Sequence, residues 1–299
     1  MNFADIRMRE NGHLEPVSYP FIPGCELTGI APDGRRVVAL TRSGAYAEKA
    51  LAPSLLTWDI PDYISDDQAC ALALQGQSAW HMLFTTLQVK LHETVLIPAA
   101  AGGLGSLAVQ LAAGGGRKVI ALESGEHRKQ LARDLGAHAV VDSSDPDDLA
   151  ERILDAADGP VDAALGVAGS PALMPSLKAL APLGRMAVFG CGAGKEEPQL
   201  LDTLVTSSKT VSGFWLPALF SDPRHPYPLM ASMEQLFRDT KEGRIKPVIG
   251  AVHSLESAVW AHMAVEEGRT CRTAGKIMLD PTEGVQHTSR PADPPVVGW

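Results

Sequence analysis

The sequence lacks the features that mark several large classes of protein. It has no basic run, and 26 Lys and Arg against 35 Asp and Glu give a formal net charge of −9. Nucleic acid is therefore not expected as a partner, because such binding depends on clustered Lys and Arg. No uninterrupted apolar segment is long enough to span a bilayer, and the first residues lack the apolar core of a secretory signal. These absences predict a cytoplasmic protein that does not enter a membrane.

Cysteine is also scarce. The chain has Cys25, Cys70, Cys191 and Cys271, far apart and without a C-x-x-C pair. Neither a disulfide framework nor a structural zinc site is predicted, and we expect reduced, partly buried thiols. The 299 residues contain 45% hydrophobic and 20% charged residues, which is typical of a soluble globular protein with room for two domains.

The most informative segment covers residues 94–113, TVLIPAAAGGLGSLAVQLAA, in which an apolar run, a glycine cluster and an amphipathic run follow one another. A strand that enters a glycine turn and opens a helix points backbone N–H groups and a positive dipole end at a ligand, which favours a pyrophosphate. An ordinary strand–turn–helix that uses glycine for packing is the alternative. In the fingerprint G-x-G-x-x-G, the predicted cofactor-binding residues are Ala100, Gly102, Gly103, Leu104 and Gly105, with Ala100 replacing the first glycine.

The flanking pattern supports a dinucleotide site. Short apolar strands at 94–98, 118–122, 138–142, 161–165 and 185–190 alternate with helices such as 126–135 and 146–157, and 200–216 adds a helix and a strand. This alternation predicts an α/β fold, a doubly wound parallel sheet covered on both faces. Glu123 ends the second strand, close to the place about 20 residues after the last glycine where an acid holds the adenosine ribose.

The two ends of the chain have a different texture. Residues 2–59 are predicted to be β-rich and irregular, with extended pieces at 36–40 and 45–51. After the alternating part we expect a helix at 228–242, a strand at 249–253, a helix at 255–266 and a strand at 275–279. Residues 281–299 are rich in proline and are predicted to form a flexible tail.

Several sequence blocks occur in a characteristic order: NFADIRMR (2–9), PFIPGCELTG (20–29), GAYAEKALAP (44–53), QGQSAWHML (75–83), AAAGGLG (99–105), LAPLGRMAVFG (180–190), SGFWL (212–216) and EGRIKPVIG (242–250). In these blocks the chain resembles the zinc-free quinone oxidoreductase branch of the medium-chain dehydrogenase/reductase superfamily, over residues 2–279. The resemblance implies a Rossmann domain at 66–216 beside a GroES-like β-rich domain at 1–65 and 217–280. The cofactor and substrate would lie in the cleft between them.

The resemblance also gives a test for a catalytic metal. Zinc-dependent relatives carry ligands at the positions of Asn2, Cys25 and Leu74, and only Cys25 could bind a metal here. Catalytic zinc requires three protein ligands and an open position, so no metal site is predicted. The resemblance then implies hydride transfer from a reduced nicotinamide to a quinone or an α,β-unsaturated carbonyl.

Two residues are candidates for catalysis. Asn2 matches an asparagine that relatives place near the nicotinamide and the substrate, and a capping or turn role is the alternative. His13 matches a tyrosine of many relatives and is a candidate general acid, because imidazole donates a proton near neutral pH. An exposed loop histidine is the alternative for His13. Lys276, in the last strand, is interpreted as a surface charge.

Two arguments about the choice of cofactor point in opposite directions. Relatives in this branch mostly use NADPH, and Arg128 matches a basic residue that meets the adenosine phosphate, so NADP(H) is favoured. Glu123 would repel a 2′-phosphate and favour NAD(H), unless it turns to solvent and pairs with Arg128 or Lys129. By matching, further cofactor contacts are expected at Ser78, Gly190, Cys191 and Phe214; for Phe214, core packing is the alternative.

Relatives carry several β-strands before the NFAD block, and the turn at 29–36 is shorter here, so the resemblance predicts an incomplete barrel with exposed edges. Three explanations stay open: a start site assigned too far downstream, a shortened but active enzyme, or a nucleotide-binding remnant with a structural or regulatory role. A homodimer is expected, with 207–214 near its interface. No residue decides which quinone or enone is the substrate.

Overall fold

The computed structural model describes residues 1–190, 200–221, 229–267 and 274–282. Its largest feature is a six-stranded sheet with the strand order β6-β5-β4-β7-β8-β9, in which all neighbours are parallel. The strands are β4 (Thr94–Pro98), β5 (Lys118–Glu123), β6 (Ala139–Asp142), β7 (Val161–Val167), β8 (Leu180–Phe189) and β9 (Thr210–Gly213). The order reverses between β4 and β7, which makes the carboxyl end of β4 a topological switch point.

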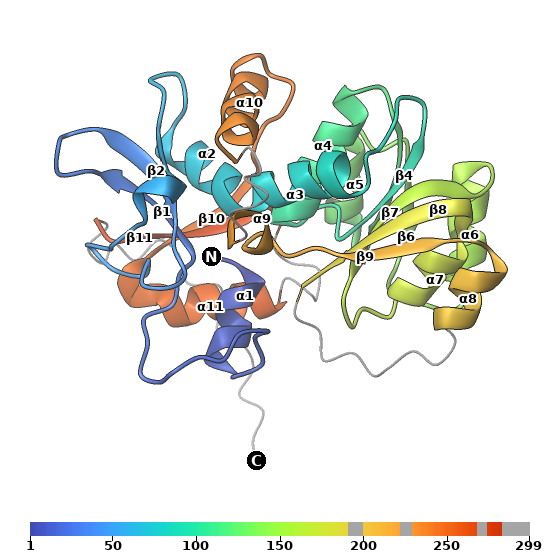
Figure 1. Ribbon diagram of the computed structural model, residues 1–299, viewed down its shortest axis with the longest axis horizontal. Helices are drawn as coiled ribbons and strands as arrows, with labels where there is room; N and C mark the ends of the chain where they lie inside the picture. Colours follow the sequence, from blue (N-terminus) through green and yellow to red (C-terminus); the bar gives the residue numbers. More distant parts are fainter. Residues whose placement is uncertain (191–199, 222–228, 268–273, 283–299) are drawn as a thin grey trace.

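Helices cover both faces of this sheet (Figure 1): α4 (Gly103–Gly114), α5 (Glu126–Asp134), α6 (Leu149–Ala157), α7 (Leu173–Lys178) and α8 (Leu200–Thr206). Alternate side chains of a strand point to opposite faces. On β4, Val95 and Ile97 pack into the apolar core that includes α4, whereas Leu96 packs into the core that includes α6 and α7. The predicted doubly wound α/β fold is therefore confirmed.

One helical run leads into the sheet. It consists of α2 (Asp66–Ala71), a π-helical turn η2 (Leu72–Gly76), α3 (Gln77–His81) and a second π-helical turn η3 (Met82–Thr86). Ser65 caps its start by accepting a hydrogen bond from the Gln68 N–H. π-Helical turns insert an extra residue into a helix and are frequent at functional sites, and η2 lies against α4, the helix of the glycine loop.

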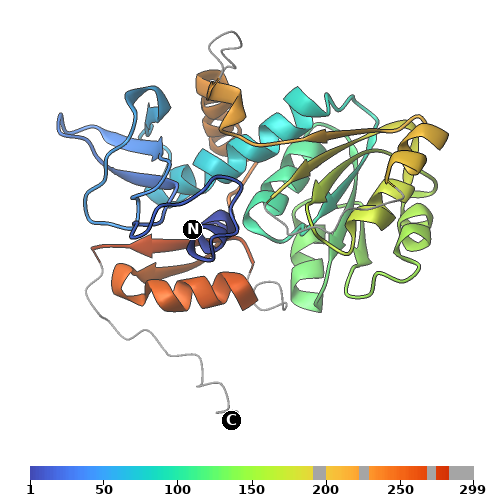
Figure 2. The same cartoon turned by 60° about the horizontal axis from the view of Figure 1, so that its bottom comes forward.

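The remaining strands form two small sheets on the other side of the helical run (Figures 1 and 2). The first is antiparallel and contains β1 (Glu26–Ile30), β2 (Arg36–Leu40) and β3 (Thr57–Asp59), with η1 (Ser54–Leu56) before β3. The second pairs β10 (Ile249–Ser254) with β11 (Lys276–Asp280) in parallel. Around them lie α1 (Phe3–Arg9), α9 (Ala218–Ser221), α10 (Leu229–Lys241), η4 (Leu255–Ser257) and α11 (Ala258–Glu267).

Two local expectations for the first part of the chain were wrong. The block after Asn2 forms the helix α1, because Asp5 accepts the Asn2 N–H at 2.8 Å in the first turn while Arg7 and Arg9 lie near the negative end of the helix dipole. Residues 45–51 form no strand; only Ala45 and Tyr46 are tied by backbone hydrogen bonds, to the carbonyls of residues 24 and 23. The expected tail beyond residue 282 lies outside the described residues. In the described part of the chain, no helix combines the length and apolar character needed to cross a bilayer.

Candidate functional site

The glycine loop follows β4 at the topological switch point, and α4 starts at its end. Gly102 is the N-cap of α4, and no side chain caps the helix. Among the described residues, the N–H groups of Gly103, Leu104 and Gly105 donate to no protein acceptor. Three unbonded N–H groups at a helix start form an anion-binding site, so the loop fits the diphosphate of a dinucleotide.

Gly105 shows why the loop requires its last glycine. A Cβ atom at residue 105 would lie 2.8 Å from the Ala99 carbonyl carbon and 2.9 Å from the Ala100 Cα atom, and closer still to the Ala99 carbonyl oxygen. All three are backbone atoms, which cannot rotate away. Helix α4 thus approaches the loop as closely as the fingerprint requires of its third glycine.

The loop is also held from two directions. The Ala101 N–H donates to the Glu123 carboxylate at 3.0 Å, which ties the loop to the end of β5. The Ala101 carbonyl accepts the Gly275 N–H at 2.8 Å, and Gly102 forms an isolated parallel bridge with Gly275. The start of β11 therefore lies directly on the cofactor loop, which brings residues from the end of the chain to the site.

Glu123 and Arg128 form a buried ion pair beside the loop. The Arg128 guanidinium donates to both carboxylate oxygens, at 2.7 Å and 2.9 Å, and the side chains are only 8% and 3% exposed. Glu123 thus turns inward and not to solvent, although it does pair with Arg128. The adenosine contacts expected for these two residues stay predictions.

Asn2 lies at the centre of a buried polar cluster formed with Glu26, Gln75 and Lys276. Its Nδ2 donates to Glu26 Oε1 at 2.7 Å, and its Oδ1 accepts from Gln75 Nε2 at 3.0 Å and from Lys276 Nζ at 3.1 Å. Asn2 is also the N-cap of α1, so the capping role and a position near the loop occur together. Its catalytic role stays a prediction.

Lys276 corrects our interpretation, because it is not a surface charge. It is 1% exposed and forms an ion pair with Glu26, which in turn accepts the Leu74 N–H at 3.0 Å. Burial by itself lowers the pKa of Lys276, but the Glu26 charge outweighs it and the pKa is raised. Burial likewise opposes ionisation of Glu26, yet Lys276 lowers the pKa of that carboxyl. Both groups are therefore charged at neutral pH, and the sequence offered no local signal for this pair.

Gln75 is a second residue that sequence reasoning missed. It stands in the π-helical turn η2 and connects Asn2 to the loop. Its Oε1 is buried without a hydrogen-bond partner and lies against Gly103, where a Cβ atom would overlap the Gln75 amide. A buried orphan acceptor beside unbonded N–H groups is typical of a binding site that a ligand completes.

The other predicted residues lie on separate elements of the fold. Ser78 is buried on α3, which packs on α4. Gly190 follows β8 with a φ of +93°, a conformation that favours glycine. Phe214 is half-buried against the apolar core, and its N–H donates to the Val188 carbonyl. His13 lies in the loop after α1 and accepts the Glu15 N–H through Nδ1, at 3.2 Å. Cys191 lies outside the described residues.

Cys25 is poorly suited to bind a metal. Its Sγ lies 3.6 Å from Asp5 Oδ1 and 3.7 Å from the Arg42 carbonyl, both as a donor. Burial and then the charges of Asp5 and Glu26 raise the pKa of the Cys25 thiol well above its usual range, and the thiolate is the form that binds metals. In the ranges that the structure describes, no group of three or more His, Cys, Asp and Glu side chains could hold a metal ion.

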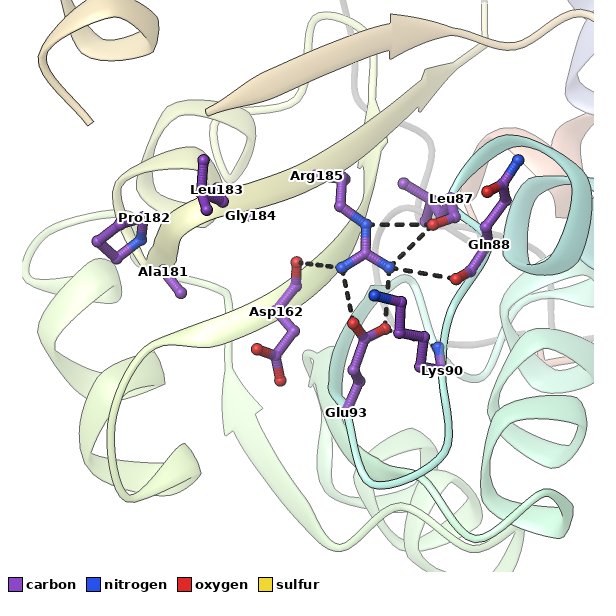
Figure 3. Close-up of a pocket in the computed structure, with 10 residues that line it drawn as sticks. All are labelled: Leu87, Gln88, Lys90, Glu93, Asp162, Ala181, Pro182, Leu183, Gly184 and Arg185. Carbon is purple, nitrogen blue, oxygen red and sulfur yellow. Dashed lines mark hydrogen bonds and ion pairs between the residues drawn. The ribbon is translucent and has the colours of Figure 1, made fainter. Parts of the chain in front are cut away.

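A hollow of about 370 Å³ lies at the opposite edge of the large sheet, where β4, β7 and β8 begin (Figure 3). The Arg185 guanidinium lines it and forms two hydrogen bonds with Glu93, at 2.8 Å and 2.9 Å, and further bonds with the Leu87 carbonyl. These bonds connect β8 to the residue that follows η3 and to the residue that precedes β4. We interpret the hollow as structural, since the Arg185 guanidinium already has protein partners.

Comparison with known proteins agrees with this geometry. A family model described as zinc-binding dehydrogenase matches residues 103–233. The quinone oxidoreductase of Rattus norvegicus is 29% identical over 273 residues, which cover 88% of this chain and 81% of the relative. The probable quinone oxidoreductase of Schizosaccharomyces pombe is 30% identical over 291 residues, which cover 93% and 85%.

The solved structures give the same result. The Escherichia coli quinone oxidoreductase complexed with NADPH matches with a TM-score of 0.85 and 28% identity, over 94% of this chain and 88% of the other. The glycine loop at the switch point, the two small sheets beside it and these similarities point to one family. The chain belongs to the quinone oxidoreductase branch of the medium-chain dehydrogenase/reductase superfamily.

Proposed function

We propose that this protein is an NADPH-dependent oxidoreductase that reduces a quinone or an α,β-unsaturated carbonyl without zinc. The observation that carries the proposal is the start of α4, where the N–H groups of Gly103, Leu104 and Gly105 are unbonded among the described residues at the carboxyl edge of a parallel sheet. Dinucleotides bind at this place in doubly wound folds. A bound NADPH would supply the hydride.

Two findings support NADPH over NADH. Solved relatives at 28% and 30% identity, from Escherichia coli and Thermus thermophilus, are described as complexes with NADPH. In this chain, the acid at the end of β5, Glu123, is paired with Arg128 and 3% exposed, so its negative charge is largely screened from a 2′-phosphate.

The chain's own residues would position the reactants. The amides of the glycine loop would bind the diphosphate, and the start of β11 fixes that loop through Gly275. Asn2, held by Glu26, Gln75 and Lys276, would orient the nicotinamide end of the cofactor. His13 would supply the proton that follows hydride transfer from its imidazolium form, in which both ring nitrogens carry a proton, so that Nδ1 gives up the Glu15 N–H that it accepts in the neutral ring.

Independence from zinc is supported by the residue types at the three positions that bind metal in zinc-dependent relatives. Asn2 and Leu74 are poor ligands for Zn²⁺, which prefers Cys, His and carboxylates. Cys25 keeps its proton at neutral pH, as its raised pKa indicates. Activity should therefore survive treatment with a chelator.

A homodimer is part of the proposal. Strand β9 is the last strand in the order of the six-stranded sheet, and the neighbouring α8 exposes Leu201 and Val205 at 72% and 79%. An unpaired strand edge beside exposed apolar side chains is a common place for association. Sedimentation should give a dimer, and Val205→Glu should increase the monomer fraction.

The test of the proposed function separates binding from turnover. Quenching of protein fluorescence would measure the Kd of NADPH and NADH, and absorbance at 340 nm would follow their oxidation with a panel of quinones and enones, with and without EDTA. We expect binding of NADPH and turnover of at least one acceptor in both conditions. Binding without turnover would favour a nucleotide-binding remnant with a structural or regulatory role, and loss of activity with EDTA would overturn independence from zinc.

A further inference from the structure

The Glu123 carboxylate accepts hydrogen bonds from several protein donors, and it would have to lose some of them in order to bind a ribose. Its Oε1 accepts from the Ala101 N–H at 3.0 Å and from Arg128 Nη2 at 2.7 Å. Its Oε2 accepts from the Ser124 N–H at 3.0 Å and from Arg128 Nε at 2.9 Å. A carboxylate has about four acceptor sites, so all of them are used within the protein.

This arrangement conflicts with the usual role of an acid at this position. In the dinucleotide fingerprint, the acid at the end of the second strand accepts hydrogen bonds from the ribose hydroxyls. Glu123 could do so only by giving up donors from a buried, bidentate pair, which is the strong type of charge-assisted hydrogen bond. Its 3% exposure leaves little surface for a ribose in any case.

The partners of Glu123 show what it does instead. Ala101 precedes the glycine that caps α4, and its carbonyl accepts the Gly275 N–H from the start of β11. Ala101 is therefore fixed through its N–H by β5 and through its carbonyl by β11. Displacing either partner would move the loop whose amides face the diphosphate.

We propose that Glu123 is a positioning residue for the glycine loop, and that its pair with Arg128 keeps a negative charge away from the adenosine 2′ position, so that NADPH is accepted. This inference rests on the proposed function and deepens it, because it names how this chain selects its cofactor. Arg128 acts here through Glu123, by holding the carboxylate against the loop.

Three variants and one control test the proposal through the Kd values of NADPH and NADH. Glu123→Gln keeps one acceptor for the Ala101 N–H but loses the ion pair, so the Kd of NADH should rise about fivefold for roughly one lost hydrogen bond. The Kd of NADPH should rise less, because the released Arg128 guanidinium attracts the 2′-phosphate. Arg128→Gln releases a charged carboxylate next to the 2′-phosphate, so the Kd of NADPH should rise about tenfold relative to that of NADH. The double variant removes this charge and should restore the wild-type ratio of the two Kd values.

Arg133→Gln is the matched control, since it removes one positive charge from the same helix α5 at a 42% exposed side chain that pairs with Glu126 and not with Glu123. It should leave both Kd values unchanged. Denaturation midpoints would show that each variant is folded. If Arg128→Gln did not fold, Arg128→Lys, which keeps the charge, would replace it, and the ratio of its two Kd values should stay near the wild-type value.

Three results would overturn the inference while the proposed function stands. A rise in the Kd of NADH alone in the double variant, which lacks both charges, would show that Glu123 is a ribose ligand. An unchanged ratio in Arg128→Gln would show that the released charge does not matter. A double variant that still binds NADPH more weakly relative to NADH than the wild type does would show that Arg128 contacts the phosphate itself. Wild-type protein that binds neither nucleotide would instead overturn the proposed function.

Discussion

The substitution Gly105→Ala is the most direct test of the glycine loop. The added methyl group would lie 2.8 Å and 2.9 Å from backbone atoms of Ala99 and Ala100. Ordinary carbon–carbon separations are about 3.5–4 Å, so α4 and the loop must separate by roughly 1 Å. The amides that face the diphosphate would then be displaced by a comparable distance.

Both stability and binding should respond to this displacement. Overpacking of this kind typically costs about 1–3 kcal/mol of unfolding free energy. A misplacement of about 1 Å in a binding site can cost two orders of magnitude in function, so the Kd of NADPH should rise at least about tenfold. Urea denaturation followed by circular dichroism would measure the first effect, and a fluorescence titration with NADPH the second.

Gly114→Ala is the matched control within the same helix. A Cβ atom at residue 114 would have its nearest neighbour at 3.9 Å, the Arg244 carbonyl oxygen, which is an ordinary contact. Alanine is favoured over glycine inside a helix by about 0.5–1 kcal/mol, so this variant should be as stable as the wild type or more stable, with an unchanged Kd. If Gly105→Ala had the stability and the NADPH affinity of the wild type, the close approach of α4 to the loop would be refuted.

Three further predictions concern buried or partly buried titratable groups. Lys276→Met leaves the Glu26 carboxylate buried without its cation, so the free energy of unfolding should fall by about 3–5 kcal/mol. Adding Glu26→Gln should recover much of this lost stability. Unchanged urea denaturation midpoints in these variants would contradict the buried ion pair. For Glu93, burial opposes ionisation but Arg185 lowers the pKa. Glu93→Gln should therefore destabilise the protein by about 1.5–3 kcal/mol at pH values above the ordinary carboxyl pKa. This destabilisation should disappear as the pH falls through the lowered folded-state pKa, and the Kd of NADPH should not change. Burial lowers the pKa of His81 from 6.5 to about 4. Between those pH values the unfolded chain binds a proton that the folded chain does not, so the free energy of unfolding should rise as the pH rises from about 4 to 6.5. His81→Gln should remove this pH dependence, and a His81 ring that titrates near pH 6.5 by NMR would disprove the prediction.

Short-range patterns in the sequence were sufficient for several strands and helices. The predicted strands at 94–98 and 36–40 match β4 and β2, and the helix at 126–135 matches α5 to within a residue. These elements could be predicted because a buried strand or an amphipathic helix repeats its apolar residues every two or three to four positions. The same rule failed for residues 2–9 and 45–51, where capping and loop hydrogen bonds decide the local structure.

The sequence by itself determined the fold family and the glycine loop, since these depend on periodicity and on the spacing of neighbouring residues. Only the tertiary structure decided what surrounds the loop. Lys276 and Gly275 reach Asn2 and Ala101 from the far end of the chain, and the direction of Glu123 follows from donors on the loop and on α5. Such contacts depend on how β5, β11 and η2 pack together, and no local pattern in the chain encodes the partner of a buried charge.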